Sequence, residues 1–179
     1  MNQENKSAET ERVPNFAAAK EYKSGDVKSP DVLLYSDLYK NAMMGADSAA
    51  KMVGKAGDAE KNDSVIAGAE LRQVITDMME GYSGYAKKAA AALHELHVPA
   101  EQLTALEKLP AEIGITMQTM FDKSVSKCAE IMVNGTTMGI IDMTHALNSS
   151  SKAEERIRTD AAALLKREQQ FCDNLKKYL

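Results

Sequence analysis

Apolar residues recur every three or four positions along four separate stretches of the chain. This spacing places them on one face of an α-helix, and each stretch lasts for several turns. The four stripes cover residues 34–52, 71–96, 113–145 and 157–178. Helices with apolar stripes of this kind bury them by packing side by side, so the pattern predicts a four-helix bundle.

The sequence also carries signals for the ends of the first two helices. Residues 29–31 (Ser-Pro-Asp) place an N-cap, a first-turn proline and an acidic residue at the start of the first helix. Gly57 is a typical C-terminal cap, so we expect this helix to end there and the second to begin near Asp58. The second helix should end near His97, because Pro99 follows.

The second half of the chain begins with a connector. Residues 98–109 predict a short connector helix, and Pro110 is expected to open the third long helix, which ends near Asn148. Ser151 and Glu154 have the spacing of a capping box, in which each side chain satisfies a free backbone N–H group at a helix start. The fourth helix is therefore predicted to begin at Ser151.

Short connections between amphipathic helices are typical of antiparallel neighbours. The predicted fold is an all-α, antiparallel, up-and-down four-helix bundle over residues 29–179. Residues 1–28 are mostly polar, which predicts a mobile N-terminal arm.

Composition agrees with this interpretation and narrows the possible partners. The chain is 44% hydrophobic, is rich in the helix-forming residues Ala, Leu and Met, and has only 5% aromatic residues. Its net charge is −4 and no basic run occurs, which argues against nucleic-acid binding. It contains no apolar run long enough for a membrane span and no secretory signal, so we expect a cytoplasmic protein whose two cysteines are thiols.

The sequence offers few candidates for catalytic or metal-binding residues. The sequence has no nucleophile motif, phosphate-binding glycine loop or zinc-type cysteine pair, so an enzyme is not the favoured interpretation. His94 and His97 lie one turn apart at a helix end, where we expect solvated side chains. Asp142 and His145 share a helix face because they are three residues apart, and both fall on the apolar stripe of the third helix. They form either a metal site or a local ion pair.

With Asp142-x-x-His145 on one bundle helix and Glu70 on another, residues 30–179 resemble the ferritin-like superfamily. In its di-metal members, two helices each carry a Glu that faces the core, and the other two each carry Glu-x-x-His. The resemblance implies Asp142, His145 and Glu70 as metal ligands, with Fe, Mn or Zn as the metal. The ligand set is incomplete: Gln73 stands where the partner histidine of Glu70 is expected, and the fourth helix has no histidine.

Glu168 interrupts the apolar stripe of the fourth helix. Burying a carboxylate is costly unless it is paired or protonated. We therefore expect Glu168 to form a polar site in the core, to pair with a cation of a neighbouring helix, or to lie at the edge of the stripe.

A register argument relates the third and fourth helices. If the turn between them is centred near Ser150, residues equally far before and after it lie level with each other. This places Cys128 near Cys172, both as reduced thiols. It also separates Asp142 from Glu168 by about 15 Å along the bundle, too far to share a metal.

Two functions from different classes follow. The first is a non-catalytic bundle without a cofactor that acts through a protein partner or as a homo-oligomer, with the strip Val125–Met132–Gly139 as a possible dimer surface. The alternative is a ferritin-like metal-binding protein with a degenerate site at the candidates named above. A third hypothesis, a small-ligand sensor with its pocket around Glu168, has no further residue to support it.

Overall fold

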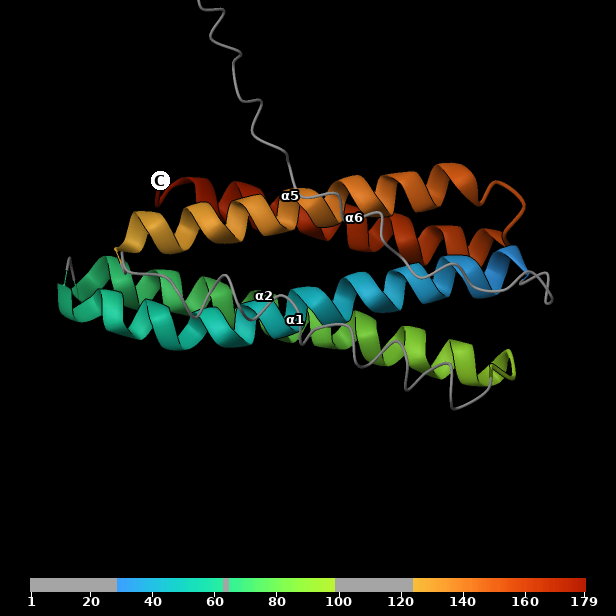
Figure 1. Ribbon diagram of the computed structural model, residues 1–179, viewed down its shortest axis with the longest axis horizontal. Helices are drawn as coiled ribbons and strands as arrows, with labels where there is room; N and C mark the ends of the chain where they lie inside the picture. Colours follow the sequence, from blue (N-terminus) through green and yellow to red (C-terminus); the bar gives the residue numbers. More distant parts are fainter. Residues whose placement is uncertain (1–28, 63–64, 99–123) are drawn as a thin grey trace, which may run out of the picture.

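The computed structural model describes residues 29–62, 65–98 and 124–179. All regular secondary structure in these ranges is α-helix: α1 (Pro30–Asn62), α2 (Val65–Glu95), α5 (Val125–Ser149) and α6 (Glu155–Lys176). α1 packs against α2 and α5 packs against α6, and the two pairs form two layers (Figure 1). The predicted all-α helical bundle is confirmed. None of the helices described is long and apolar enough to cross a membrane.

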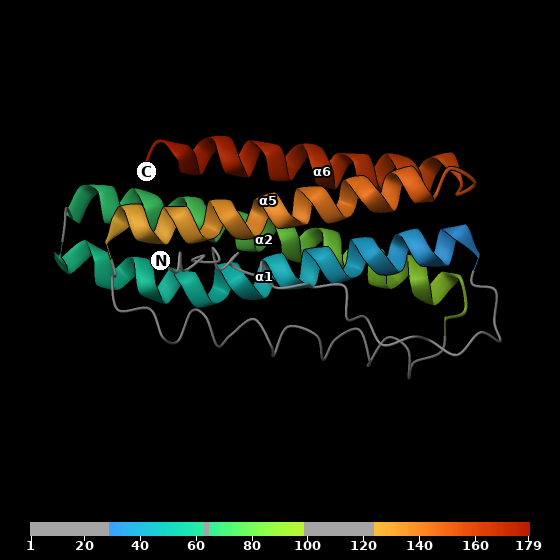
Figure 2. The same cartoon turned by 45° about the horizontal axis from the view of Figure 1, so that its top comes forward.

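The helix directions follow from contacts at one end of the bundle. The Tyr35 hydroxyl near the start of α1 donates to Asp160 near the start of α6, and Lys88 in the last third of α2 also contacts Asp160. α1 and α2 therefore run in opposite directions, as do α5 and α6, whereas α2 and α5 run in the same direction (Figure 2). The strict up-and-down order that the sequence predicts is not confirmed.

Three predictions lie outside the described residues: the arm over residues 1–28, the short helix of the 98–109 connector, of which Val98 alone is described, and the helix start at Pro110. α5 itself begins at Val125, in the middle of the predicted third helix. Ser124 is its N-cap, with an extended backbone (ψ 156°), and its hydroxyl accepts a hydrogen bond from the Lys127 amide at 3.2 Å.

The predicted start of α1 is confirmed, because the Ser29 hydroxyl accepts the Val32 amide at 3.2 Å. The predicted end at Gly57 is wrong, since α1 continues to Asn62. Its buried stripe continues through Met52 and Ala56, both 0% exposed. This packing outweighs the roughly 1 kcal/mol that a glycine costs inside a helix.

α2 ends close to the predicted position. His97 has a positive φ of 56°, and the amides of His97 and Val98 donate to the carbonyls of His94 and Leu93. This pair of bonds is the Schellman motif that closes many helices, here with histidine in the place usually taken by glycine. Val98 and Leu93 are both buried, which supplies the apolar contact that accompanies the motif.

The predicted capping box is wrong. α6 begins at Glu155, its N-cap is Glu154, and the Glu154 side chain makes no capping bond. Instead, the Glu154 amide donates to the Asp31 carboxylate of α1 at 2.8 Å. Ser151 is exposed, and Ala153 is buried in the turn that precedes the helix. A contact between two helices thus takes the place of the local capping bonds.

The later start of α6 changes its register against α5. A turn centred near Ser150 would place Glu168 level with Met132. In the structure Glu168 lies against Gly139, seven residues further along α5. The Cys172 sulfur lies 3.9 Å from both the Val133 carbonyl oxygen and the Thr137 hydroxyl, not beside Cys128. Both cysteines are free and buried, as expected of thiols.

The proposed dimer strip on α5 is also wrong. Val125 and Met132 are only 8% and 4% exposed, and Gly139 packs against α6, so this face points into the bundle. The core includes the following residues, all under 2% exposed: Leu34, Leu38, Met52, Leu71, Ile75, Met78, Leu93, Met143 and Leu164.

Candidate functional site

A buried polar layer crosses the middle of the bundle, with one group from each helix. Its centre is the Glu168 carboxyl group of α6, which is 0% exposed. The Tyr82 hydroxyl of α2 donates to Glu168 Oε1 at 3.2 Å. Asn41 Nδ2 of α1 donates to the Gly139 carbonyl of α5 at 3.0 Å and to Glu168 Oε2 at the longer distance of 3.4 Å. Of the three sequence-based interpretations of Glu168, the polar core site is the one observed.

Two glycines make room for this layer. A Cβ atom on Gly139 would lie 2.5 Å from Glu168 Oε1 and 2.8 Å from Asn41 Oδ1. A Cβ atom on Gly45 would lie 2.6 Å from the Tyr82 ring. All three distances are shorter than packed atoms tolerate, so glycine at these two positions lets the polar side chains enter the core.

The electrostatics of the layer are those of a carboxyl group removed from water. Burial raises the pKa of Glu168 to about 8, and the hydrogen bonds from Tyr82 and Asn41 only partly oppose this shift. The negative charge of Asp142 raises the pKa further. Burial and the neighbouring Glu168 also raise the pKa of Tyr82 far above its usual value. At neutral pH the layer is therefore uncharged, with Glu168 protonated.

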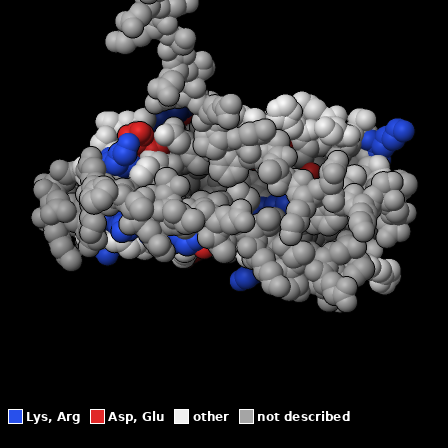
Figure 3. All heavy atoms as spheres, in the orientation of Figure 1, with Lys and Arg blue, Asp and Glu red and all other residues white. Residues whose placement is uncertain are grey.

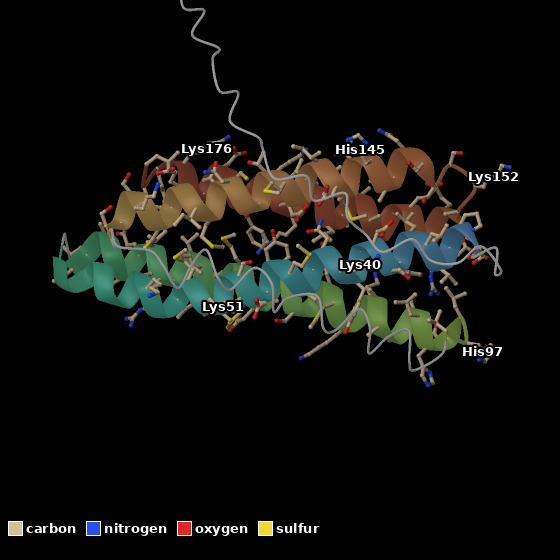
Figure 4. All side chains as sticks on the ribbon, in the orientation of Figure 1. Lys40, Lys51, His97, His145, Lys152 and Lys176 are labelled. Carbon is tan, nitrogen blue, oxygen red and sulfur yellow. The ribbon has the colours of Figure 1, made fainter. Side chains whose placement is uncertain are left out.

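The three metal candidates from the sequence lie elsewhere. Asp142, His145 and Glu70 are all exposed, although the first two were expected on the apolar stripe. His145 points outward from α5 (Figure 4). The predicted 15 Å separation of Asp142 from Glu168 is wrong, because Asp142 follows Gly139 by a single turn and its charge acts on Glu168.

Glu70 cannot join the other two candidates. Tyr82 and Gly139 both contact Glu168 and so lie level on α2 and α5, which run in the same direction. Glu70 precedes Tyr82 by 12 residues and Asp142 follows Gly139 by 3, so 15 residues separate them along the bundle. At the helical rise this is about 22 Å. Among the described residues, no three His, Cys, Asp or Glu side chains come together in a way that could hold a metal ion.

Comparison with known proteins adds no relative: no protein family, no curated protein and no solved structure matches this chain. The interpretation of the site therefore depends on its geometry alone.

Sequence reasoning found Glu168 but missed its partners. Tyr82 is an ordinary member of the second apolar stripe and Asn41 lies beside the first, and nothing in their spacing marks them as partners of a distant carboxyl group. The available signal was the small residues: Gly45 lies on the stripe of the first helix, between Ala42 and Ala49, and Gly139 shares a face with Val125 and Met132. A glycine inside a predicted helix usually has a packing reason.

We predict that Gly139→Ala destabilises the protein, because its methyl group would enter the space of Glu168 and Asn41. The expected loss is about 1–3 kcal/mol of unfolding free energy, measured by urea denaturation. Gly135→Ala is the matched control on the same helix: a Cβ there meets nothing within 4 Å. It should stabilise the protein by up to about 1 kcal/mol. Equal effects of the two substitutions would contradict the crowded layer.

The second prediction concerns pH. In the unfolded chain Glu168 loses its proton near its ordinary pKa of 4.5, whereas the folded protein holds this proton until about pH 8. Between these values the native state binds one more proton, so its stability falls as pH rises, by up to about 1.4 kcal/mol per pH unit. Glu168→Gln keeps the shape and removes the titration. Its stability relative to the natural protein should therefore increase steadily from pH 5 to about pH 8.

Urea denaturation at several pH values measures this difference. Glu130→Gln is the control, because Glu130 is exposed on α5 and pairs with Lys127 of the same helix. Parallel stability curves for the natural protein and Glu168→Gln would show that the Glu168 carboxyl does not retain its proton in the folded protein.

Proposed function

We propose that this chain is a non-catalytic helical-bundle protein that acts by self-association, through the outer face of α5. The observation that carries the proposal is a pair of large apolar side chains in the middle of that face. Met138 is 44% exposed and Ile141 is 51% exposed, and they lie one turn apart. Neighbouring exposed apolar side chains of this kind are typical of protein contact sites.

The charge distribution favours a second copy of the chain as the partner. The whole chain is 27% charged, but the 21 residues from 131 to 151 contain one Lys, Arg, Asp or Glu, namely Asp142. Two copies can therefore bring this face together without strong repulsion, and depletion of charge is typical of the centre of an interface. The space-filling view shows uncharged surface over the C-terminal half of α5 (Figure 3).

The buried layer supports the non-catalytic part of the proposal. Glu168 is fully enclosed, and both of its oxygens already accept hydrogen bonds. A general acid or base has to come within hydrogen-bond reach of a substrate. Glu168 meets that requirement only if the bundle opens, so its position is better suited to fixing the packing of the four helices.

We also infer that the bundle is ferritin-like in topology. Because α2 and α5 run in the same direction, the end of α2 and the start of α5 lie at opposite ends of the bundle. One long crossover of this kind distinguishes ferritin-like bundles from simple up-and-down ones. The central layer supports the inference: α6 carries Glu168-x-x-Phe171 where a di-metal protein would carry Glu-x-x-His.

Self-association predicts a concentration-dependent dimer in sedimentation equilibrium. Met138→Gln/Ile141→Gln should shift the protein to monomer, because it removes the apolar centre of the face. Leu33→Gln/Leu96→Gln is the matched control, since these side chains are 45% and 39% exposed on α1 and beyond the end of α2. A natural protein that remains monomeric at high concentration, or two double variants that weaken the dimer equally, would exclude this face.

A second candidate function is metal binding by a degenerate ferritin-like site at Asp142 and His145, favoured by the crossover topology. Asp142 and His145 supply only two metal ligands, and Glu70 lies too far away to supply a third. We therefore expect no stoichiometric metal in protein purified without a metal-affinity tag, measured by elemental analysis. Iron, manganese or zinc near one per chain that disappears in Asp142→Asn/His145→Ala would favour metal binding over self-association alone.

A further inference from the structure

A second polar site lies away from the buried layer, at the end of the bundle where α1 and α6 begin and α2 ends. A cleft of about 370 Å³ opens there between these three helices. Its volume falls in the range of small-molecule sites. It is independent of the α5 face, since α5 contributes no residue to its lining.

Two ion pairs bound the cleft. Lys88 Nζ lies 2.6 Å from Asp160 Oδ1, and Arg156 lies 3.6 Å from Glu95 Oε2. In each pair one residue comes from α2 and the other from α6, but the signs are reversed between the pairs. The two cations therefore lie diagonally across the cleft, and so do the two carboxylates.

Small side chains and a phenol form the rest of the wall. Between Lys88 and Glu95, α2 presents Ala91 and Ala92 to the cleft, which leaves the space between the ion pairs open. The Tyr35 hydroxyl of α1 donates to Asp160 Oδ2 at 3.0 Å. Asp160 thus receives one hydrogen bond from α1 and one from α2. These bonds hold its carboxylate in place, and its side chain is only 10% exposed.

The other three charged groups of the cleft are exposed and can therefore contact a bound molecule. The side chains of Lys88, Glu95 and Arg156 are 60%, 70% and 69% exposed. Exposed ion pairs contribute little to stability because water and salt screen them. A bound molecule can therefore replace either partner of the Arg156–Glu95 pair at small cost. Charged side chains fixed around a pocket orient the molecule that enters it.

We infer that this cleft binds a small zwitterion, a molecule with an ammonium group and a carboxylate joined by a short apolar chain. The ammonium group pairs with Glu95, the carboxylate pairs with Lys88 or Arg156, and the apolar chain lies on the alanines. A molecule with one charge gains a single pair and leaves the opposite pole of the cleft unused. The inference does not depend on self-association.

The test is an NMR titration of the full-length protein with 5-aminopentanoate as the probe. Pentanoate and pentylamine are matched probes that each retain one of its charges, and all three are compared at the same ionic strength. We expect saturable shifts of amides around Ala91 and Ala92, with a Kd for 5-aminopentanoate at least tenfold lower than for either matched probe. Glu95→Gln and Arg156→Gln should each weaken its binding severalfold. Because both side chains are largely exposed, these variants should fold normally.

Lys127→Gln provides the control, since it removes an exposed cation from α5 without touching the cleft. It should leave the Kd unchanged. Pentanoate binding as tightly as the zwitterion would make this a simple anion site and overturn the inference. If 5-aminopentanoate causes no saturable shifts and both cleft variants are folded, the inference is wrong and the two ion pairs only join α2 to α6.

Discussion

The free-energy cost of placing one carboxyl group in the middle of a four-helix bundle shapes the rest of this structure. Water cannot solvate Glu168, and no Lys or Arg is among the groups that perturb it. The group therefore keeps its proton to about pH 8, and its oxygens take hydrogen bonds from Tyr82 and Asn41. Each of the four helices must bring a particular residue to the same level, so this layer fixes their mutual register in a way that apolar side chains alone do not.

The register depends in turn on how α6 begins. A local capping box with Ser151 as the N-cap would start the helix three residues earlier and bring Glu168 opposite a different part of α5. In the structure Asp31 of α1 accepts the Glu154 amide, and Ala153 is buried in the turn. The first turn of α1 thereby positions the start of α6, and the position of that start brings Glu168 over Gly139, the residue on α5 with space for it.

These two contacts show what the sequence could and could not predict. The stripes identified the four helices, and Ser29 marked the start of α1, because both signals are local. The end of α1 and the start of α6 were predicted wrongly, since Gly57 is overridden by packing and Ser151 by a contact with another helix. The same limit applies to the site: Glu168 was conspicuous within its own stripe. Its partners are 86 and 127 residues away in the sequence and could be found only once the helices were placed.

The interior and the surface of the bundle differ in where charged groups lie. The buried layer is uncharged at neutral pH, and residues 131–149 of α5 contain a single Lys, Arg, Asp or Glu, namely Asp142, with His145 one turn away. By contrast, four charged side chains gather around one cleft at the end of α2. Glu168 is fully enclosed and already hydrogen-bonded, so it fixes the packing of the helices. Binding to another molecule requires groups that can exchange their present partners for that molecule. The α5 face and this cleft both have that property, the first through exposed apolar side chains and the second through exposed charges.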